Sequence, residues 1–191
     1  MVKSGELQTS VSISDKRGLY LPDLDTKYYL PEIKLLEEGI EAHKRKDFMT
    51  AWECFNTHAD LGDTTAKYWK GYYLWEGYVD EKDRAKASEL FKEAADDGLP
   101  EAQLKYAFSL VEKSRVDRGM VIEYLTKAAE NNNTAAQFHL GDLYVNGNLN
   151  VPKDKQKGIK YLKLAALSKH PKALETLQKM NINLYNHDSI N

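Results

Sequence analysis

The sequence has little of several residue types and patterns that would point to secretion or to a membrane. It holds one cysteine, Cys54, in 191 residues, so no disulfide can form within the chain. A single cysteine argues for a reducing compartment or for indifference to redox state. No apolar run approaches the ~18–20 residues that a membrane span needs, and residues 1–5 lead into no apolar signal segment. We therefore expect a cytoplasmic protein, with the nucleus also possible, and no membrane partner.

The chain also lacks a strong net charge. It has 27 Lys and Arg against 29 Asp and Glu, a formal net charge of -2, so the whole molecule has no bulk attraction to nucleic acid. The distribution is uneven, because residues 1–100 carry 14 basic and 20 acidic side chains while residues 151–191 carry 8 and 3. All eight basic residues of the last segment are lysines, whereas bidentate phosphate recognition favours arginine. The basic end is interpreted as a solvated helix face or as a patch for an acidic peptide or anionic surface, and nucleic acid is not expected as a partner.

Groupings typical of catalytic or metal sites are also missing from the sequence. None of the five histidines lies in an H-E-x-x-H motif or pairs with a cysteine at metal-binding spacing. Cys54 is next to Phe55 in an apolar helical pattern, which predicts a small core residue rather than a nucleophile. His58 directly precedes Ala59, an alanine of the repeat pattern described below, and is expected to be packed in the core. We expect no cofactor, no metal and no enzymatic activity.

What the sequence does contain is an internal repeat. One column of alanines recurs at intervals of 36, 34 and 37 residues, and a second column keeps the same three intervals. The first column is Ala59, Ala95, Ala129 and Ala166, and the second is Ala66, Ala102, Ala136 and Ala173. Two columns that stay in step through unequal intervals indicate a repeat architecture.

Each period contains two patterns of apolar residues spaced three and four apart, which predict two helices of about a dozen residues. Turn-forming stretches such as 97–100 and 131–133 separate them, so the helices should pair as antiparallel hairpins. Asp83 and Asp154 precede helical patterns and are expected to cap them. The paired alanines should allow close helix packing, with Phe91, Leu125 and Leu162 filling the layer between units. The predicted fold is an all-α solenoid of stacked helix hairpins, an α-α superhelix.

These motifs resemble the Sel-one-like repeat family, a relative of the tetratricopeptide repeats. The residues that carry the resemblance are Gly77, Val79, Asp83, Lys86, Ala87, Phe91, Lys92, Ala94, Ala95, Gly98, Ala102 and Gln103, then Ala136, Gln137, Leu140, Gly141, Tyr144, Gly147, Val151, Asp154, Tyr161, Lys163, Ala165 and Ala166. The match covers about residues 50–180 and weakens at Ala107, where the neighbouring units have Gly71 and Gly141. The resemblance implies an adaptor in signalling or complex assembly that binds partners on the concave face, lined by the first helix of each pair.

The predicted organisation has three parts. Residues 1–30 form a flexible or locally docked N-terminal segment, residues 31–180 form the solenoid of about four hairpins, and residues 181–191 form a tail. Residues 33–55 are similar to an ordinary tetratricopeptide unit, with Gly39 twelve residues before Ala51. The last helix, 172–180, is expected to cap the stack.

The predicted partner-binding positions come from aligning the first helices of the units. Residues three and four apart share a helix face, and by resemblance that face lines the groove. The predicted partner-binding residues are Trp69, Tyr72, Glu76, Lys105, Phe108, His139 and Asp142.

The helix around Trp69 holds six aromatic residues within residues 68–78, more than the repeat pattern needs. Tyr68 and Tyr73 are expected to pack internally, which leaves Trp69 and Tyr72 as candidate anchors for a partner. Alternatively, these two side chains contact a second copy of the chain or pack internally, for example on the N-terminal segment. Their role as anchors predicts that replacing both with alanine weakens binding and hardly changes the melting temperature.

The preferred interpretation is a non-enzymatic adaptor that binds a peptide or protein of unknown identity. One alternative is a structural protein that self-associates, for instance as a homodimer. Another is a regulatory repeat module related to kinase-linked members of the family, although this sequence has no kinase motifs of its own.

Overall fold

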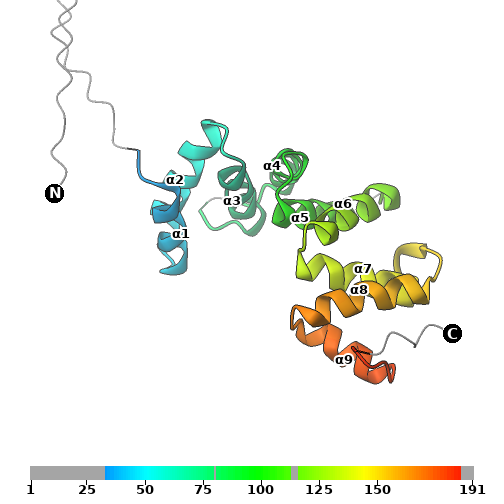
Figure 1. Ribbon diagram of the computed structural model, residues 1–191. Helices are drawn as coiled ribbons and strands as arrows, with labels where there is room; N and C mark the ends of the chain where they lie inside the picture. The colour runs from blue at the N-terminus through cyan, green and yellow to red at the C-terminus, as the bar shows by residue number, and fades with distance from the viewer. Residues whose placement is uncertain (1–32, 80, 113–115, 186–191) are drawn as a thin grey trace, which may run out of the picture. The chain divides into compact units, whose positions relative to one another are not determined.

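The computed structural model describes residues 33–79, 81–112 and 116–185, and within them the chain forms nine α-helices and one short 3-10 turn (Figure 1). The helices are α1 (Leu36–Lys44), α2 (Phe48–Asp60), α3 (Thr64–Glu76), α4 (Arg84–Asp96), α5 (Pro100–Val111), α6 (Arg118–Glu130), α7 (Thr134–Asn146), α8 (Lys155–Leu167) and α9 (Pro171–Lys179), with the turn η1 (Asn148–Asn150) after α7. The predicted segment 1–30 lies outside the described residues, as do residues 186–191 of the predicted tail.

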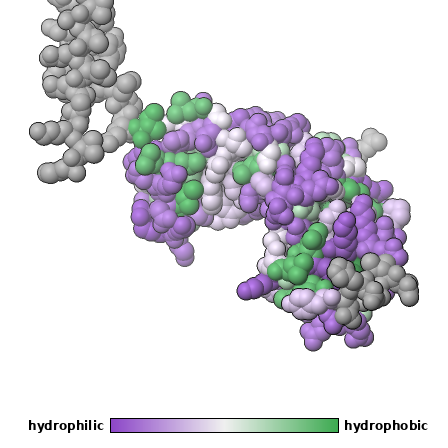
Figure 2. Space-filling view, viewed as in Figure 1, coloured by the Kyte–Doolittle hydropathy of each residue, from purple (hydrophilic) through white to green (hydrophobic). Residues whose placement is uncertain are grey.

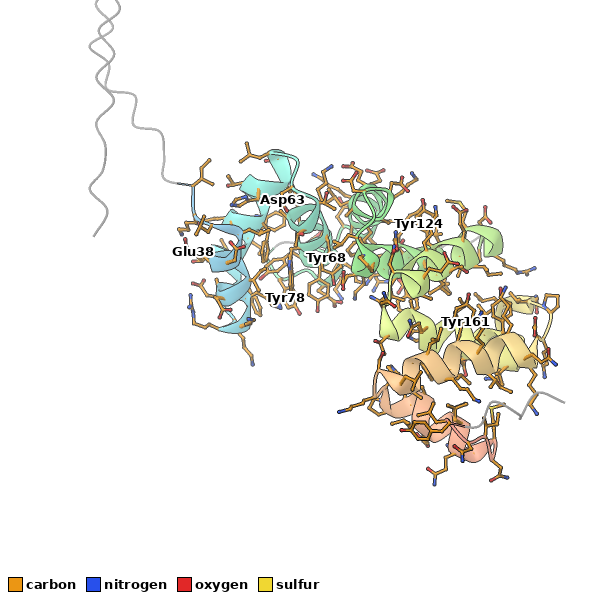
Figure 3. The ribbon with its side chains drawn as sticks, in the orientation of Figure 1. Glu38, Asp63, Tyr68, Tyr78, Tyr124 and Tyr161 are labelled. Carbon is orange, nitrogen blue, oxygen red and sulfur yellow. The ribbon has the colours of Figure 1, made fainter. Side chains whose placement is uncertain are left out.

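Side-chain caps set where most of these helices begin. Asp83 accepts a hydrogen bond from the backbone N–H of Lys86 at 2.9 Å, and Asp154 accepts one from Lys157 at the same distance. Asp63, labelled in Figure 3 at the start of α3, does the same for Ala66 at 2.7 Å. Each cap satisfies a backbone donor that the helix itself leaves unpaired, which is worth about 0.5–2 kcal/mol. The caps predicted at Asp83 and Asp154 are confirmed.

Two helices end at a glycine in the left-handed conformation. Gly77 after α3 and Gly147 after α7 both have φ of 72°, and their N–H groups donate to Tyr73 and Leu143. A side chain is strained at this φ, so glycine ends the helix at low cost. Since both glycines end the first helix of a unit, the chain turns in the same way before α4 and before η1.

The helices pack chiefly on their neighbours in the chain, so that α1 pairs with α2, α3 with α4, α5 with α6, and α7 with α8 (Figure 1). The ninth helix packs on α8. Both alanine columns are buried, and Phe91, Leu125 and Leu162 are at most 3% exposed beside them. The predicted all-α repeat solenoid and its core columns are thus confirmed.

Helices α7 and α8 approach each other closely at two glycines. A Cβ added at Gly141 would lie 2.8 Å from Cγ of Leu162, and one added at Gly158 would lie 2.6 Å from Cγ2 of Val145. Both distances are too short for real atoms, so the two helices depend on glycine to pack this tightly. At the equivalent place in the preceding unit, α5 carries Ala107, which is fully buried.

The core is divided along the chain in the way expected of a solenoid. One cluster lies in α1–α3, a second in α4–α7, and a third in α8 and α9, with partly buried residues from adjacent helices packed on each. The face drawn in Figure 2 is mostly hydrophilic, with hydrophobic residues in small separate patches. Stability therefore comes from each hairpin stacking on the next rather than from one central core.

Candidate partner-binding face

The seven predicted partner-binding residues lie on the first helices of three units, α3, α5 and α7. All seven are half-buried, so each packs on the body of the protein and still presents part of its side chain to solvent. The structure brings them together in two groups rather than in one continuous row. One group contains the aromatic residues of α3 with Lys105, and the other contains Phe108, His139 and Asp142.

The first group centres on Tyr72. The Lys105 ammonium nitrogen lies 4.9 Å from the centre of the Tyr72 ring, a cation–π contact between α3 and α5. The Tyr72 hydroxyl is 3.4 Å from that of Tyr78, which Figure 3 labels after the end of α3. The hydrogen bond with Tyr78 and burial raise the pKa of Tyr72, and the negative charge of Glu76, one turn further along α3, raises it further.

Trp69 and Tyr72 of this group also belong to an aromatic cluster centred on His43, which the sequence pattern does not reveal. The ring of His43, from α1, has five aromatic rings with centres 4.9–6.1 Å away. They belong to Phe48, Trp69, Tyr72, Tyr73 and Tyr78. The rings come from α2, α3 and the turn after α3, so no single helical pattern in the sequence marks His43 as their centre.

Burial controls the protonation of this cluster. It lowers the pKa of His43 and raises the pKa of Tyr73 to about 12, so the imidazole favours its neutral form and the phenol keeps its proton. The Nδ1 atom of His43 lies 2.9 Å from the Tyr73 hydroxyl, which can donate to it. A neutral imidazole with one hydrogen bond fits an aromatic environment better than a charged one does.

This cluster changes the interpretation of Trp69. Its ring stacks on Phe55 with centres 5.2 Å apart and contacts His43 at 4.9 Å, so internal packing accounts for one face of the indole. Of the alternatives that the sequence leaves open, internal packing is thus observed for Trp69 and Tyr72, on side chains of α1, α2 and α3 among the described residues. A role for their exposed parts in binding stays a prediction.

The second group lines a cavity of about 350 Å³ between α5, α6, α7 and η1. Most of its lining is apolar, and three of these side chains are core residues that form its floor. The apolar lining residues are Phe108, Val111, Val121, Leu125, Leu143 and Leu149. The volume is at the lower end of the ~300–1,000 Å³ typical of ligand pockets.

The polar side chains of this cavity are at its rim. Asp142 accepts hydrogen bonds from the side-chain amides of Asn146 and Asn148, at 2.7 and 3.0 Å. Glu112 is paired with Arg84. His139 contacts the Phe108 ring edge-on at 4.8 Å, and burial lowers its pKa. The rim thus combines one acid bound to neutral amides, one acid bound to a cation, and a histidine that favours its neutral form.

A second, smaller cavity of about 240 Å³ lies on the other side of His139. Phe138 and His170 line it with their rings stacked at 4.6 Å, and Lys172 lines it from α9. Since His139 lines both cavities, the hollowed surface continues from α5 across α7 to α9.

Cys54 and His58, which the sequence placed in the core, differ in outcome. Cys54 is buried, its thiol donates to the Leu35 carbonyl oxygen at 3.1 Å, and burial raises its pKa, so it is a packed thiol rather than an activated one. His58 is only half-buried, and its Nε2 lies 2.7 Å from the Lys34 carbonyl oxygen. The prediction of a core residue was wrong for His58, because a polar ring with a nearby backbone partner gains little from full burial.

Two further findings concern the described part of the chain. In residues 33–79, 81–112 and 116–185, no three His, Cys, Asp or Glu side chains come together as metal ligands would. None of the helices described there is long and apolar enough to cross a membrane.

The nine helices that the structure describes form stacked hairpins, with half-buried side chains along the first helix of each unit, and define a helical repeat protein of the interaction-scaffold type. Residues 65–99, 100–133 and 134–170 each match the Sel1 repeat, and the chain belongs to the Sel1 repeat family. Members of this family are generally protein–protein interaction modules. The predicted family membership is confirmed, with each repeat running from the first helix of a hairpin through its second helix.

Known proteins extend this comparison. The chain is 33% identical over 96 residues to the DAP3-binding cell death enhancer 1 of Rattus norvegicus and 32% identical to that of Mus musculus. The match covers 50% of this chain and 19% of each relative's length.

Solved structures show the same fold. A Sel1 repeat protein from Oxalobacter formigenes matches with a TM-score of 0.67 and 26% identity, over 78% of this chain and 64% of that one. A protective antigen of uropathogenic Escherichia coli strains, which has the same repeat fold, matches with a TM-score of 0.68 and 20% identity, over 75% of this chain and 32% of that one.

Proposed function

We propose that this chain is a non-enzymatic scaffold that binds a peptide or protein partner on the face formed by α3, α5 and α7, the concave face of the solenoid. The observation that carries the proposal is the cavity of about 350 Å³ between α5, α6 and α7, because Phe108, His139 and Asp142 all line it. The alignment of the first helices predicts all three as groove positions from the sequence alone. An apolar hollow with a few polar groups at its rim is a common form of binding site.

The remaining predicted residues extend the proposed face. Tyr72, Lys105 and the exposed part of Trp69 continue it from α5 to α3, and aromatic side chains held in place by packing are effective anchors for partners. The ring of Trp69 is fixed from below by Phe55 and His43, so a partner would meet a surface that is already ordered.

The partner's identity is part of the proposal. The relatives are named for binding DAP3, which makes a DAP3-like protein one partner to include in a binding test. A role in signalling or complex assembly, and a location in the cytoplasm or nucleus, follow from the same family-level reasoning.

The test compares capture of proteins from the native cell by three forms of the chain. The first is the wild type and the second carries Lys105→Glu with Asp142→Lys on the proposed face. The control carries Lys86→Glu with Glu89→Lys, the same exchange of charges on exposed positions of α4. We expect a protein captured by the wild type and the control but not by the face variant, with all three forms equally helical by circular dichroism.

The captured protein is then purified and its affinity for the same three forms measured by calorimetry. Equal affinity for the face variant and the wild type would place the binding elsewhere and refute the proposed face.

A homodimer is the second candidate, and exposed leucines favour it. Leu164, Leu167 and Leu174 in α8 and α9 are between 38 and 59% exposed. Light scattering at several concentrations tests this candidate, with Leu167→Lys and Leu174→Lys expected to abolish any dimer. A monomer at every concentration would exclude it.

A further inference from the structure

The apolar and charged side chains that line the cavity between α5, α6 and α7 indicate which kind of peptide can bind there. We infer that it accepts a large apolar side chain of a peptide segment that carries a lysine or arginine beside that side chain. The inference rests on the proposed function, because it concerns the same face, and it adds what the partner must present there.

The apolar part of the inference comes from the floor of the cavity. Val121, Leu125 and Leu143 are at most 5% exposed, yet they also line this open hollow. Phe108 from α5 and Leu149 from η1 also line the cavity. A polar side chain placed there would lose its hydration without gaining a hydrogen bond from this floor, whereas an apolar side chain would remove more apolar surface from water.

The cationic part comes from Asp142. Both of its carboxylate oxygens accept hydrogen bonds, but the donors are the neutral amides of Asn146 and Asn148, and no cation of residues 33–79, 81–112 or 116–185 forms a salt bridge with this carboxylate. The other rim acid, Glu112, already has Arg84 as its partner. His139 favours its neutral form and adds no cation of its own. A lysine or arginine of the partner would therefore meet a carboxylate that no described cation pairs with, while an acidic residue would be repelled.

The turn η1, which contributes Leu149, is held in an uncommon conformation. Leu149 has φ of 56° and ψ of 25°, the left-handed region that a bulky side chain seldom adopts. Its neighbour Asn148 is tied to Asp142, so one hydrogen bond both orients the acid and fixes the turn that brings Leu149 to the cavity. Strained backbone of this kind is often found where a binding surface is held ready.

The experiment begins with a phage library of random 12-residue peptides and the purified full chain as bait. The library is first depleted on Val111→Trp, which fills the cavity from a rim position that is 38% exposed and therefore tolerant of a larger side chain. We expect the enriched peptides to share a large apolar residue with lysine or arginine within two positions of it.

The best enriched peptide is then labelled, and its affinity is measured by fluorescence anisotropy. Asp142→Asn should weaken binding at least about fivefold at 50 mM salt, and the difference should shrink at 500 mM because salt screens the charge. Asp142→Glu, which keeps the charge, should bind better than Asp142→Asn. Glu89→Gln removes an acid from an exposed position of α4 and should change nothing.

The possible failures are distinguishable. Enrichment of acidic peptides, of peptides without an apolar residue, or of none would overturn the inference, as would equal affinity for Asp142→Asn and the wild type. The proposed face would survive any of these results if Lys105→Glu with Asp142→Lys still lost a captured protein. Binding that is unaffected by every one of these variants would refute both.

Discussion

Replacing Ser168 with asparagine should stabilise the protein, because it would complete a hydrogen bond that one repeat makes and the next lacks. Gln103 and Gln137 hold the same position in successive repeats, are both buried, and donate to the carbonyl oxygens of Ala95 and Ala129 at 3.2 and 3.1 Å. The side-chain oxygen of Gln103 also accepts from Asn131, at 3.2 Å. That of Gln137 accepts no hydrogen bond from any described residue.

Ser168 occupies the position that corresponds to Asn131, because each lies two residues after a buried alanine of the first column, Ala166 and Ala129. Both residues follow a helix, and their backbone angles agree, with φ of −82° in each and ψ of 15° for Ser168 against 23° for Asn131. An asparagine at 168 should therefore direct its amide toward Gln137 as Asn131 does toward Gln103. The serine is exposed, so the change buries no new polar group.

The expected gain follows from the cost of an unpaired buried acceptor. A hydrogen bond contributes a net ~0.5–1.5 kcal/mol, and leaving a buried partner unsatisfied costs ~1–3 kcal/mol, so Ser168→Asn should add about 1 kcal/mol to the free energy of unfolding. For a chain of this size that corresponds to an increase of about 2–4 °C in melting temperature. Urea unfolding followed by circular dichroism measures the difference.

Two companion variants make this prediction specific. Asn131→Ser should lower stability by a similar amount, and Ser168→Asn should lose its effect when Gln137 is first replaced by methionine. No gain from Ser168→Asn, or an equal gain in the Gln137→Met background, would refute the reasoning.

Three other predictions follow from the packing. Gly141→Ala should destabilise by about 1–3 kcal/mol, measured by urea unfolding, because the new methyl group would meet Leu162 at 2.8 Å; a neutral result would show that α7 and α8 can separate. Stability should fall as the pH is lowered from 7.5 through the ordinary histidine pKa of about 6.5. Burial lowers the pKa of His43, so unfolding takes up a proton in this range. His43→Gln should reduce this dependence of the free energy of unfolding on pH, and an unchanged slope would exclude His43 as its source. Trp69→Ala with Tyr72→Ala should lower the free energy of unfolding by at least about 2 kcal/mol, because both rings pack in the aromatic cluster; an unchanged melting temperature would restore the view that they are surplus to packing.

The sequence by itself determined the architecture of this protein. The two alanine columns, the capping aspartates and the turn residues are local signals that recur in every unit, and a solenoid is built mainly from contacts between neighbours in the chain. Reading those signals was therefore enough to predict the hairpins, the buried columns and the repeat family. Alignment of the first helices likewise predicts Phe108, His139 and Asp142 as groove positions, although Phe108 also packs against the core.

Only the tertiary structure decided what those positions form together. The cavity needs side chains from α5, α6, α7 and η1 at particular distances, and column alignment places residues on helices without giving the space between them. The packing of Trp69 is a similar case, because its partners Phe55 and His43 belong to an earlier hairpin with a different repeat pattern. The left-handed turn at Leu149 carries no glycine to mark it in the sequence. Contacts between non-equivalent residues of different units leave no periodic trace, so the face that we propose for binding became visible only once the helices were packed.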